Sequence, residues 1–181
     1  MLKTTPPSKG LLFFSVLYRA DLYSFSFFEE RISSLFGPCI RFKPQFNPLK
    51  SYYQKEMGED GPIERFFFVC TTSMPREFLL STKILGLDWE LEWSVENKRR
   101  VNVDVGFISL ENFILATTKS FSHRIYLGQN IYGDLTYLTQ NGTYQSLPWT
   151  YPDYRDEEKM EFFNWCRSMI PFHNESRNFE K

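Results

Sequence analysis

The sequence is poor in the residues that most often carry metal or nucleophilic chemistry. Its 181 residues include two histidines and three cysteines, and no Cys-x-x-Cys pair occurs. Common zinc-ligand spacings are therefore absent, and three widely spaced cysteines argue against a disulfide framework. Reduced thiols in this pattern favour a cytoplasmic location.

Further absences narrow the class of function. No apolar run approaches the roughly 20 residues of a membrane-spanning helix, so we expect no membrane partner. Lys and Arg number 21 against 22 Asp and Glu, so the basic excess of a general nucleic-acid-binding protein is missing. No glycine lies in a P-loop, a Rossmann G-x-G-x-x-G or a G-x-S-x-G elbow, which excludes the usual nucleotide and serine-hydrolase motifs.

Hydrophobic periodicity predicts an α+β fold that begins with the element order β-α-β-β-α-β. This order is typical of a ferredoxin-like core. The predicted elements are a strand over 11–18, a helix over 25–36, an edge strand over 39–46, a strand over 63–70, a helix after Pro75 with a buried stripe of Leu80, Ile84, Leu87 and Leu91, and a strand over 101–108.

The rest of the chain is expected to extend this core. We predict a flexible arm over 1–9, one domain over 10–170 (core 10–108, extension 109–170) and a polar tail over 171–181. The extension is predicted to hold a short helix over 110–118, a hairpin of 122–127 with 131–138, a strand over 143–147 and a final helix over about 156–170.

The register of this hairpin follows from its two faces. A three-residue loop over 128–130 places Arg124 opposite Asp134 and Leu127 opposite Ile131, which separates apolar from polar side chains. The expected buried face holds Ile125, Leu127, Ile131, Gly133, Leu135 and Tyr137, and the polar face holds Arg124, Tyr126, Tyr132, Asp134 and Thr136. His123 falls on the apolar side, which favours a packed or capping histidine over a catalytic base.

Candidate site residues concentrate in two β segments and the loop between them: Asn102, Asp104, Lys119, Arg124, Asp134 and Thr136. If the two polar faces meet, they form a pocket for a small anionic ligand such as a nucleotide or a sugar phosphate. Arg124 and Lys119 would bind the anionic group, and the aromatic rings of Trp149 and Tyr151 would cover it. We also include Tyr126, which lies on the same polar face, among the predicted ligand-binding residues.

Other interpretations stay open at this stage. Asp104 and Asp134 could hold Mg²⁺, or serve as the base of a phosphoryl- or glycosyl-transfer enzyme. The aromatic loop over 149–154 could bind a partner protein, and Tyr52 and Tyr53 in the long loop 47–62 could form part of a binding wall. The plainest alternative is a solvated sheet face tied by ion pairs.

Four ordered strings add a resemblance to these arguments: YYQKEMG (52–58), VNVDVG (101–106), TKSFSHRIYL (118–127) and LPWTYPDY (147–154). With them the chain resembles a bacterial family catalogued as a domain of unknown function, DUF4416, over about Gly10 to Ile170. Members sometimes carry the label "GTP-binding protein". The family implies no established reaction, but its strings coincide with the polar side chains above and so favour a site there.

Overall fold

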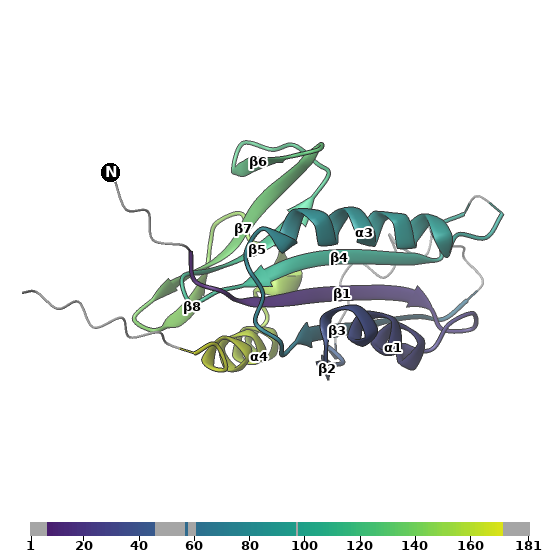
Figure 1. Cartoon of the computed structure of the whole chain (residues 1–181), viewed down its shortest axis with the longest axis horizontal. Coiled ribbons are helices and arrows are strands. Elements are labelled where there is room, and N and C mark those ends of the chain that lie inside the picture. Colours follow the sequence, from purple (N-terminus) through teal and green to yellow (C-terminus); the bar gives the residue numbers. More distant parts are fainter. Residues whose placement is uncertain (1–6, 46–56, 58–60, 97, 172–181) are drawn as a thin grey trace, which may run out of the picture.

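A computed structural model describes residues 7–45, 57, 61–96 and 98–171. Within these residues, three α-helices and a short 3₁₀ helix accompany an eight-stranded antiparallel sheet, which confirms the mixed helix-and-strand class (Figure 1). The elements are β1 (Leu11–Arg19), α1 (Phe25–Phe36), β2 (Cys39–Phe42), β3 (Ile63–Cys70), α3 (Phe78–Glu92), β4 (Val101–Ile108), β5 (Asn112–Thr117), β6 (Arg124–Gly128), β7 (Ile131–Gln140), β8 (Thr143–Ser146), η1 (Pro152–Tyr154) and α4 (Glu157–Ser168).

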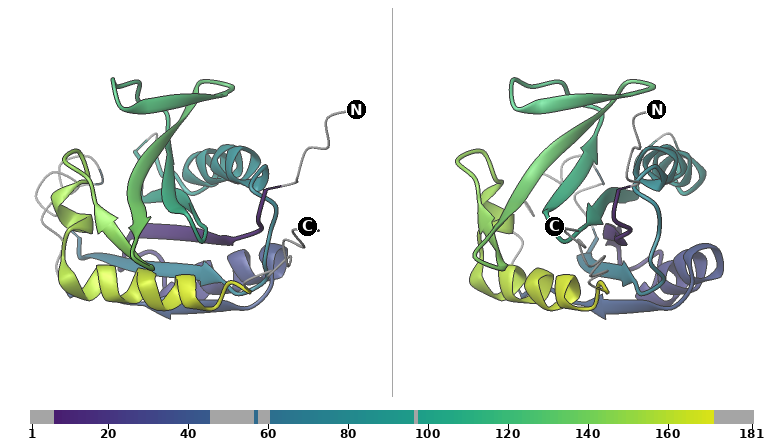
Figure 2. Two further views of the ribbon diagram at one scale, coloured as in Figure 1. Left: turned by 90° about the vertical axis from the view of Figure 1, so that its left-hand side faces the viewer. Right: turned by 60° about the vertical axis from the view of Figure 1, so that its left-hand side comes forward.

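The first six of these elements occur in the predicted order, and β3 and β4 have the predicted bounds. The strands are arranged as β2-β3-β1-β4-β5-β7-β6, and β8 pairs with the end of β7. β2 lies at the sheet edge, as predicted for a strand over 39–46 that contains Pro44, but it ends at Phe42 because a proline cannot donate to a sheet ladder. The sheet is strongly curled: β5 and β7 rise away from β1 toward β6 (Figure 2).

Alternate residues of β1 enter two separate aromatic cores. Phe14, Val16 and Tyr18 pack toward α1 and α3, whereas Leu11 and Phe13 pack toward α4. Figure 2 shows α1 and α3 on one side of these strands and α4 on the other. Burial of both faces explains the unbroken apolar run of this strand.

The predicted helix over 110–118 is wrong, because this segment forms strand β5. A tight turn joins it to β4: the Ser109 amide donates to the Asn112 carbonyl at 2.9 Å, and the Ser109 hydroxyl donates to the same oxygen at 2.9 Å. Phe113 and Leu115 then face the core under α4, while Ile114 faces the other core. A short apolar run has the same appearance in a buried helix and a two-faced strand, and here the turn decides.

The predicted buried stripe of α3 is correct only in part, since Leu80, Ile84 and Leu87 pack half-buried against the core but are not the most buried residues of the helix. Leu91 is 74% exposed, and the buried residues are Leu79, Thr82, Lys83, Gly86 and Trp89. Gly86 explains the rotation, because a Cβ atom there would lie 3.3 Å from both Val103 Cγ1 and Val105 Cγ2. The glycine that weakens the helix on propensity is thus the point at which α3 lies close against β4.

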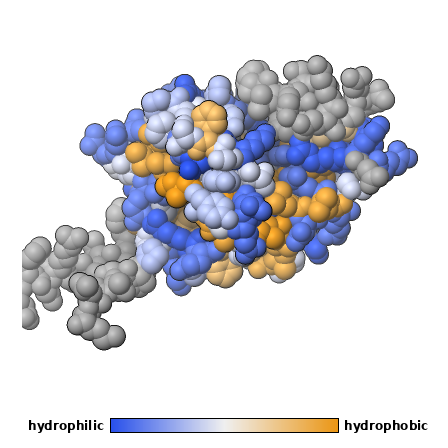
Figure 3. All heavy atoms as spheres, turned by 90° about the horizontal axis from the view of Figure 1, so that it is seen from above, coloured by the Kyte–Doolittle hydropathy of each residue, from blue (hydrophilic) through white to orange (hydrophobic). Residues whose placement is uncertain are grey.

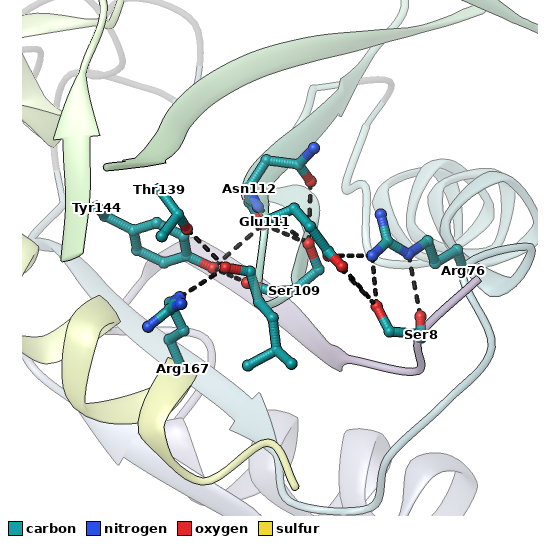
Figure 4. A network of polar contacts seen from close by, with 9 residues as sticks. Ser8, Arg76, Ser109, Glu111, Asn112, Thr139, Tyr144 and Arg167 are labelled. Carbon is teal, nitrogen blue, oxygen red and sulfur yellow. Dashed lines mark hydrogen bonds and ion pairs between the residues drawn. The ribbon is translucent and has the colours of Figure 1, made fainter. Parts of the chain in front are cut away.

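A polar network fixes the turn between β4 and β5 (Figure 4). Tyr144 donates to the Ser109 carbonyl at 2.5 Å, and Arg167 of α4 donates to the Leu110 carbonyl at 2.8 Å. On the other side, Glu111 binds Arg76 and accepts a hydrogen bond from Ser8. Ser8 lies within the predicted arm and is therefore joined to the sheet. The division into arm, domain and tail otherwise stays a prediction, since 1–6 and 172–181 lie outside the described residues.

Replacing Phe13 with alanine is expected to destabilise the protein by about 3–5 kcal/mol, because a buried ring leaves a cavity. Its ring centroid lies 5.1 Å from that of Phe67 and 5.1 Å from that of Phe163. Urea unfolding measures the change in the free energy of unfolding. Leu91→Ala is the matched control and should change it by less than about 0.5 kcal/mol. A large cost at Leu91 would contradict the observed orientation of α3.

Candidate functional site

A polar cleft opens where β4 and β5 separate. These strands pair only from Val105–Ala116 to Ile108–Phe113, so none of the described strands borders the first half of β4 on that side. The space beside it is a cleft of about 610 Å³, which lies within the usual range for small-molecule sites. Its charged and polar lining includes Arg65, Lys83, Glu90, Arg99, Asn102, Asp104, Lys119, Arg124, Asp134, Tyr151 and Asp153.

Side chains of α3 take the place of a strand beside Val103. The Lys83 ammonium donates to the Val103 carbonyl at 2.8 Å, and Glu90 Oε1 accepts from the Val103 amide at 2.6 Å. Val103 pairs with Val16 of β1 on one side, and on its β5 side both of its backbone groups are satisfied by these side chains in place of a strand. This arrangement keeps the cleft from closing by strand pairing.

Strand alternation brings the predicted residues to one face of the sheet. In the register, Gly106 lies opposite Leu115, and Leu115 lies opposite Asp134. Asn102 and Asp104 precede Gly106 at intervals of two, so their side chains share that face. Six predicted site residues line the cleft: Asn102, Asp104, Lys119, Arg124, Asp134 and Tyr151. Tyr126, Trp149 and Thr136 lie outside its lining.

Arg124 is held on three sides at the cleft wall. Its Nε donates to Asp134 Oδ2 at 2.8 Å, one terminal nitrogen donates to the Lys119 carbonyl at 2.8 Å, and the other donates to the Tyr151 hydroxyl at 3.0 Å. The predicted cross-strand pair of Arg124 with Asp134 is confirmed. These bonds make Arg124 a positioning residue that joins β6, the 117–119 segment and the aromatic loop.

The predicted faces of the hairpin are wrong on β6 and only partly right on β7, where Ile131, Gly133 and Tyr137 are buried as predicted but Asp134 and Thr136 are buried too. The turn residues Gln129 and Asn130 both have positive φ angles, and Gly128 rather than Leu127 lies opposite Ile131. The bulge at Leu127 keeps Arg124 opposite Asp134. Ile125 is 69% exposed, whereas Asp134 is buried, because the cleft and the aromatic loop lie over the polar face.

His123 is not on the apolar side as predicted. Its Nε2 lies 3.3 Å from Asp134 Oδ2, and its ring stacks on Trp149 with centroids 5.3 Å apart. Trp149 in turn donates from its indole nitrogen to the Leu135 carbonyl at 2.8 Å. The histidine therefore links Asp134 to the aromatic loop from behind the cleft wall.

A buried charge cluster that the sequence did not indicate forms another wall. Arg65 of β3 pairs with Asp153 of η1, and Lys159 Nζ of α4 lies 3.2 Å from Asp153 Oδ1. The side chains of Arg65 and Lys159 are 5% and 1% exposed. In the sequence, Arg65 interrupts the apolar strand over 63–70. A charge at a position that should enter the core was the available signal.

Within the described residues, three charged groups of the cleft make no ion pair: Lys83, which donates to the Val103 carbonyl, Lys119 and Asp104. Among the described residues, no partner is recorded for the Lys119 side chain, and Asp104 accepts only from Asn102 Nδ2, at 3.0 Å. Arg65 Nε is also buried without a hydrogen-bond partner there. Lys119 and Asp104 are therefore the groups a ligand could engage without breaking an existing contact.

The structure also bears on the predicted Mg²⁺ site, the long loop and membrane crossing. No cluster of three or more His, Cys, Asp or Glu side chains that could hold a metal occurs in the described part of the chain, so Mg²⁺ at Asp104 would need ligands of other kinds. Tyr52 and Tyr53 lie outside the described residues. Of the helices described, none has the length and hydropathy to cross a membrane.

Replacing Asp153 with alanine is expected to cost about 3–5 kcal/mol of stability, because Arg65 would stay buried without its ion-pair partner and Lys159 would keep only Asp156, at 3.6 Å. Urea unfolding of the variant tests this. The exposed acid Asp88 provides the control, and its alanine variant should stay within about 0.5 kcal/mol of the wild type. Equal small effects for both variants would show that the cluster contributes no stability.

Glu90 predicts a pH dependence of stability. Burial raises the pKa of this carboxyl above its ordinary value, against the lowering effect of its bond from the Val103 amide. The folded protein therefore holds the proton more tightly than the unfolded chain, and stability falls as the pH rises from the ordinary carboxyl pKa through the raised one.

The variant Glu90→Gln cannot ionise, so it should lack this decline. Urea unfolding between about pH 4 and pH 8 should show the variant gaining stability relative to the wild type as the pH rises. A difference that does not change with pH would contradict the raised pKa.

The comparisons with known proteins agree with the resemblance. A family model described as "Domain of unknown function (DUF4416)" matches residues 8–169. No curated protein and no solved structure matches this chain. The match covers most of the sequence, including every residue of the cleft, and the chain therefore belongs to the DUF4416 family.

Proposed function

We propose that this protein binds a small ligand with an anionic group in the cleft between β4 and β5. The observation that carries the proposal is the excess of positive groups in one concave site. Five cationic side chains line it against four carboxylates: Arg65, Lys83, Arg99, Lys119 and Arg124 against Glu90, Asp104, Asp134 and Asp153.

Some of these charged groups are already paired with one another and hold the cleft in shape, whereas others are left to bind a ligand. Asp134 is bound by Arg124, Asp153 by Arg65, and Glu90 lies 3.6 Å from Arg99. Lys119 is left to attract a phosphate or carboxylate as a point charge. The Asp104 carboxylate is left to accept hydrogen bonds from hydroxyl or base groups of the ligand, and the Asn102 side chain is left to donate to them. Tyr151 places an aromatic ring at the opening of the cleft. This combination suits a nucleotide or a sugar phosphate.

A catalytic function of the same cleft is the second candidate. Asp134 is occupied by Arg124 and His123, so it is a poor base. Asp104 lines the cleft with no cation recorded in contact with it, and it accepts one hydrogen bond from a neutral amide. Of the two predicted catalytic carboxylates, Asp104 is therefore the one that could take a proton from a bound hydroxyl or water.

The aromatic loop gives weaker support to a protein-interaction function. Tyr154 is buried, and Trp149 is held through its indole nitrogen. Exposed apolar residues are instead found on and beside β6, at Phe121, Ile125 and Tyr126. Figure 3 views the molecule from above, and hydrophobic patches lie there among hydrophilic residues.

We also propose a ferredoxin-like core and a cytoplasmic location for this protein. We interpret the first six elements as a ferredoxin-like core, which the order β2-β3-β1-β4 with antiparallel pairs supports. Three free cysteines suit the reducing cytoplasm of a bacterium. Phosphorylated metabolites are available to a protein in that compartment.

A thermal-shift titration tests the proposed binding. The probes are inorganic phosphate, GMP, GTP and glucose 6-phosphate, each with and without Mg²⁺. At least one phosphorylated probe should raise the melting temperature, and Lys119→Ala should weaken its binding about tenfold, the effect of one charge-assisted hydrogen bond.

The control is Lys98→Ala, since Lys98 is an exposed lysine outside the cleft lining. It should bind the probe as the wild type does. The proposal fails if no probe stabilises the wild type, or if the two lysine variants weaken binding equally.

A further inference from the structure

Two cysteines that are far apart in the sequence lie in direct contact on neighbouring strands. Cys39 at the start of β2 is the register partner of Cys70 at the end of β3. Their sulfur atoms are 3.3 Å apart, and both thiols are free. This pair lies on the edge of the sheet and takes no part in the cleft.

The backbone geometry at this pair suits a disulfide. The Thr71 amide donates to the Pro38 carbonyl at 2.8 Å, so the adjacent pair of Cys39 and Cys70 is a non-hydrogen-bonded one. In such pairs the Cα atoms lie about 4.5 Å apart and the side chains are closest. A disulfide accepts Cα separations of about 4.4–6.8 Å.

The chain around the pair is already held in place. The hydroxyl of Thr71 also donates to the Pro38 carbonyl, at 3.0 Å. Gly37 has a φ angle of 85°, and a Cβ atom there would lie 2.4 Å from Thr72 Oγ1, so the corner before β2 lies close against the end of β3. Little backbone movement is needed to bring the sulfurs within bonding distance.

The two thiols differ in access and acidity. Cys39 is partly exposed on the edge strand, whereas Cys70 is buried. The hydrogen bond from the Cys70 thiol lowers the pKa of Cys39, and the same bond together with burial raises the pKa of Cys70. Cys39 is thus the thiol that an oxidant in solution meets, and it is the better thiolate.

We propose that Cys39 and Cys70 form a reversible oxidation site, at which a low-molecular-weight disulfide such as glutathione disulfide closes an intramolecular cross-strand disulfide. The inference is independent of the ligand proposed for the cleft.

The reaction balances in two exchange steps. The Cys39 thiolate attacks one sulfur of glutathione disulfide, which gives a mixed disulfide and releases one glutathione thiolate. Cys70 then loses its proton to solvent and attacks Cys39 Sγ, which forms the Cys39–Cys70 bond and releases the second glutathione. The two thiols lose two electrons and two protons, and one glutathione disulfide is reduced to two glutathione molecules.

Mass spectrometry of the full chain tests the proposal. The folded protein is incubated with glutathione disulfide, quenched with acid, and alkylated after unfolding. The expected product is lighter by two hydrogen atoms, contains one alkylated cysteine, Cys166, and yields a linked peptide pair with Cys39 and Cys70. Dithiothreitol should restore three alkylated cysteines, and the oxidised form should melt at a higher temperature, because a cross-link restricts the unfolded chain.

Three variants separate the roles of the cysteines. Cys166→Ser should oxidise as the wild type does, since burial raises the pKa of the Cys166 thiol to about 12. Cys70→Ser should stop at a stable glutathione adduct on Cys39. Cys39→Ser should give neither product, and Cys39→Ala repeats that test with a smaller side chain. A wild type that stays reduced at every glutathione ratio, or that accumulates the Cys39 adduct, would overturn the proposal.

Discussion

The candidate site depends on how one buried residue in β4 satisfies its backbone on the side where β5 does not pair with it. Val103 has no β5 partner, and its amide and carbonyl are bonded by Glu90 and Lys83 from α3. An unpaired buried peptide group is costly, so these two side chains permit the sheet to separate at this point. The separation turns a continuous sheet into one with a polar cleft.

The same requirement explains why Lys83 and Glu90 lie on the face of α3 that packs against β4. Lys83 is buried in the helix face that an apolar stripe would normally occupy, and Gly86 one turn later lets the helix approach β4. Elsewhere in the cleft wall, Asp153 pairs with both Arg65 and Lys159, and Asp156 lies 3.6 Å from Lys159. The buried charged side chains are therefore held by ion pairs or by backbone groups. Few charged groups of the cleft remain available to bind a ligand. This is why Lys119 and Asp104, rather than Arg124 and Asp134, carry the proposed recognition.

The sequence predicts the strands and the face of the site better than it predicts which side chains are available. Two-faced apolar runs indicate β1 and β3, and alternation indicates β4 and places Asn102 and Asp104 on one face. Periodicity could not separate a strand from a helix at β5, where the Ser109–Asn112 turn decides. It also could not place His123 beside Asp134, because that contact depends on the bulge at Leu127 and on the loop above it. Arg65 and the Cys39–Cys70 contact depend on pairings between distant segments.

Amide hydrogen exchange at Val103 tests this account most directly. Phe107 of the same strand is the reference, since it lies in the part that pairs with β5. The account predicts that the Val103 amide exchanges as slowly as that of Phe107, and that Glu90→Ala accelerates Val103 far more than Phe107. Rapid exchange of Val103 in the wild type, or equal acceleration of both amides in the variant, would contradict it.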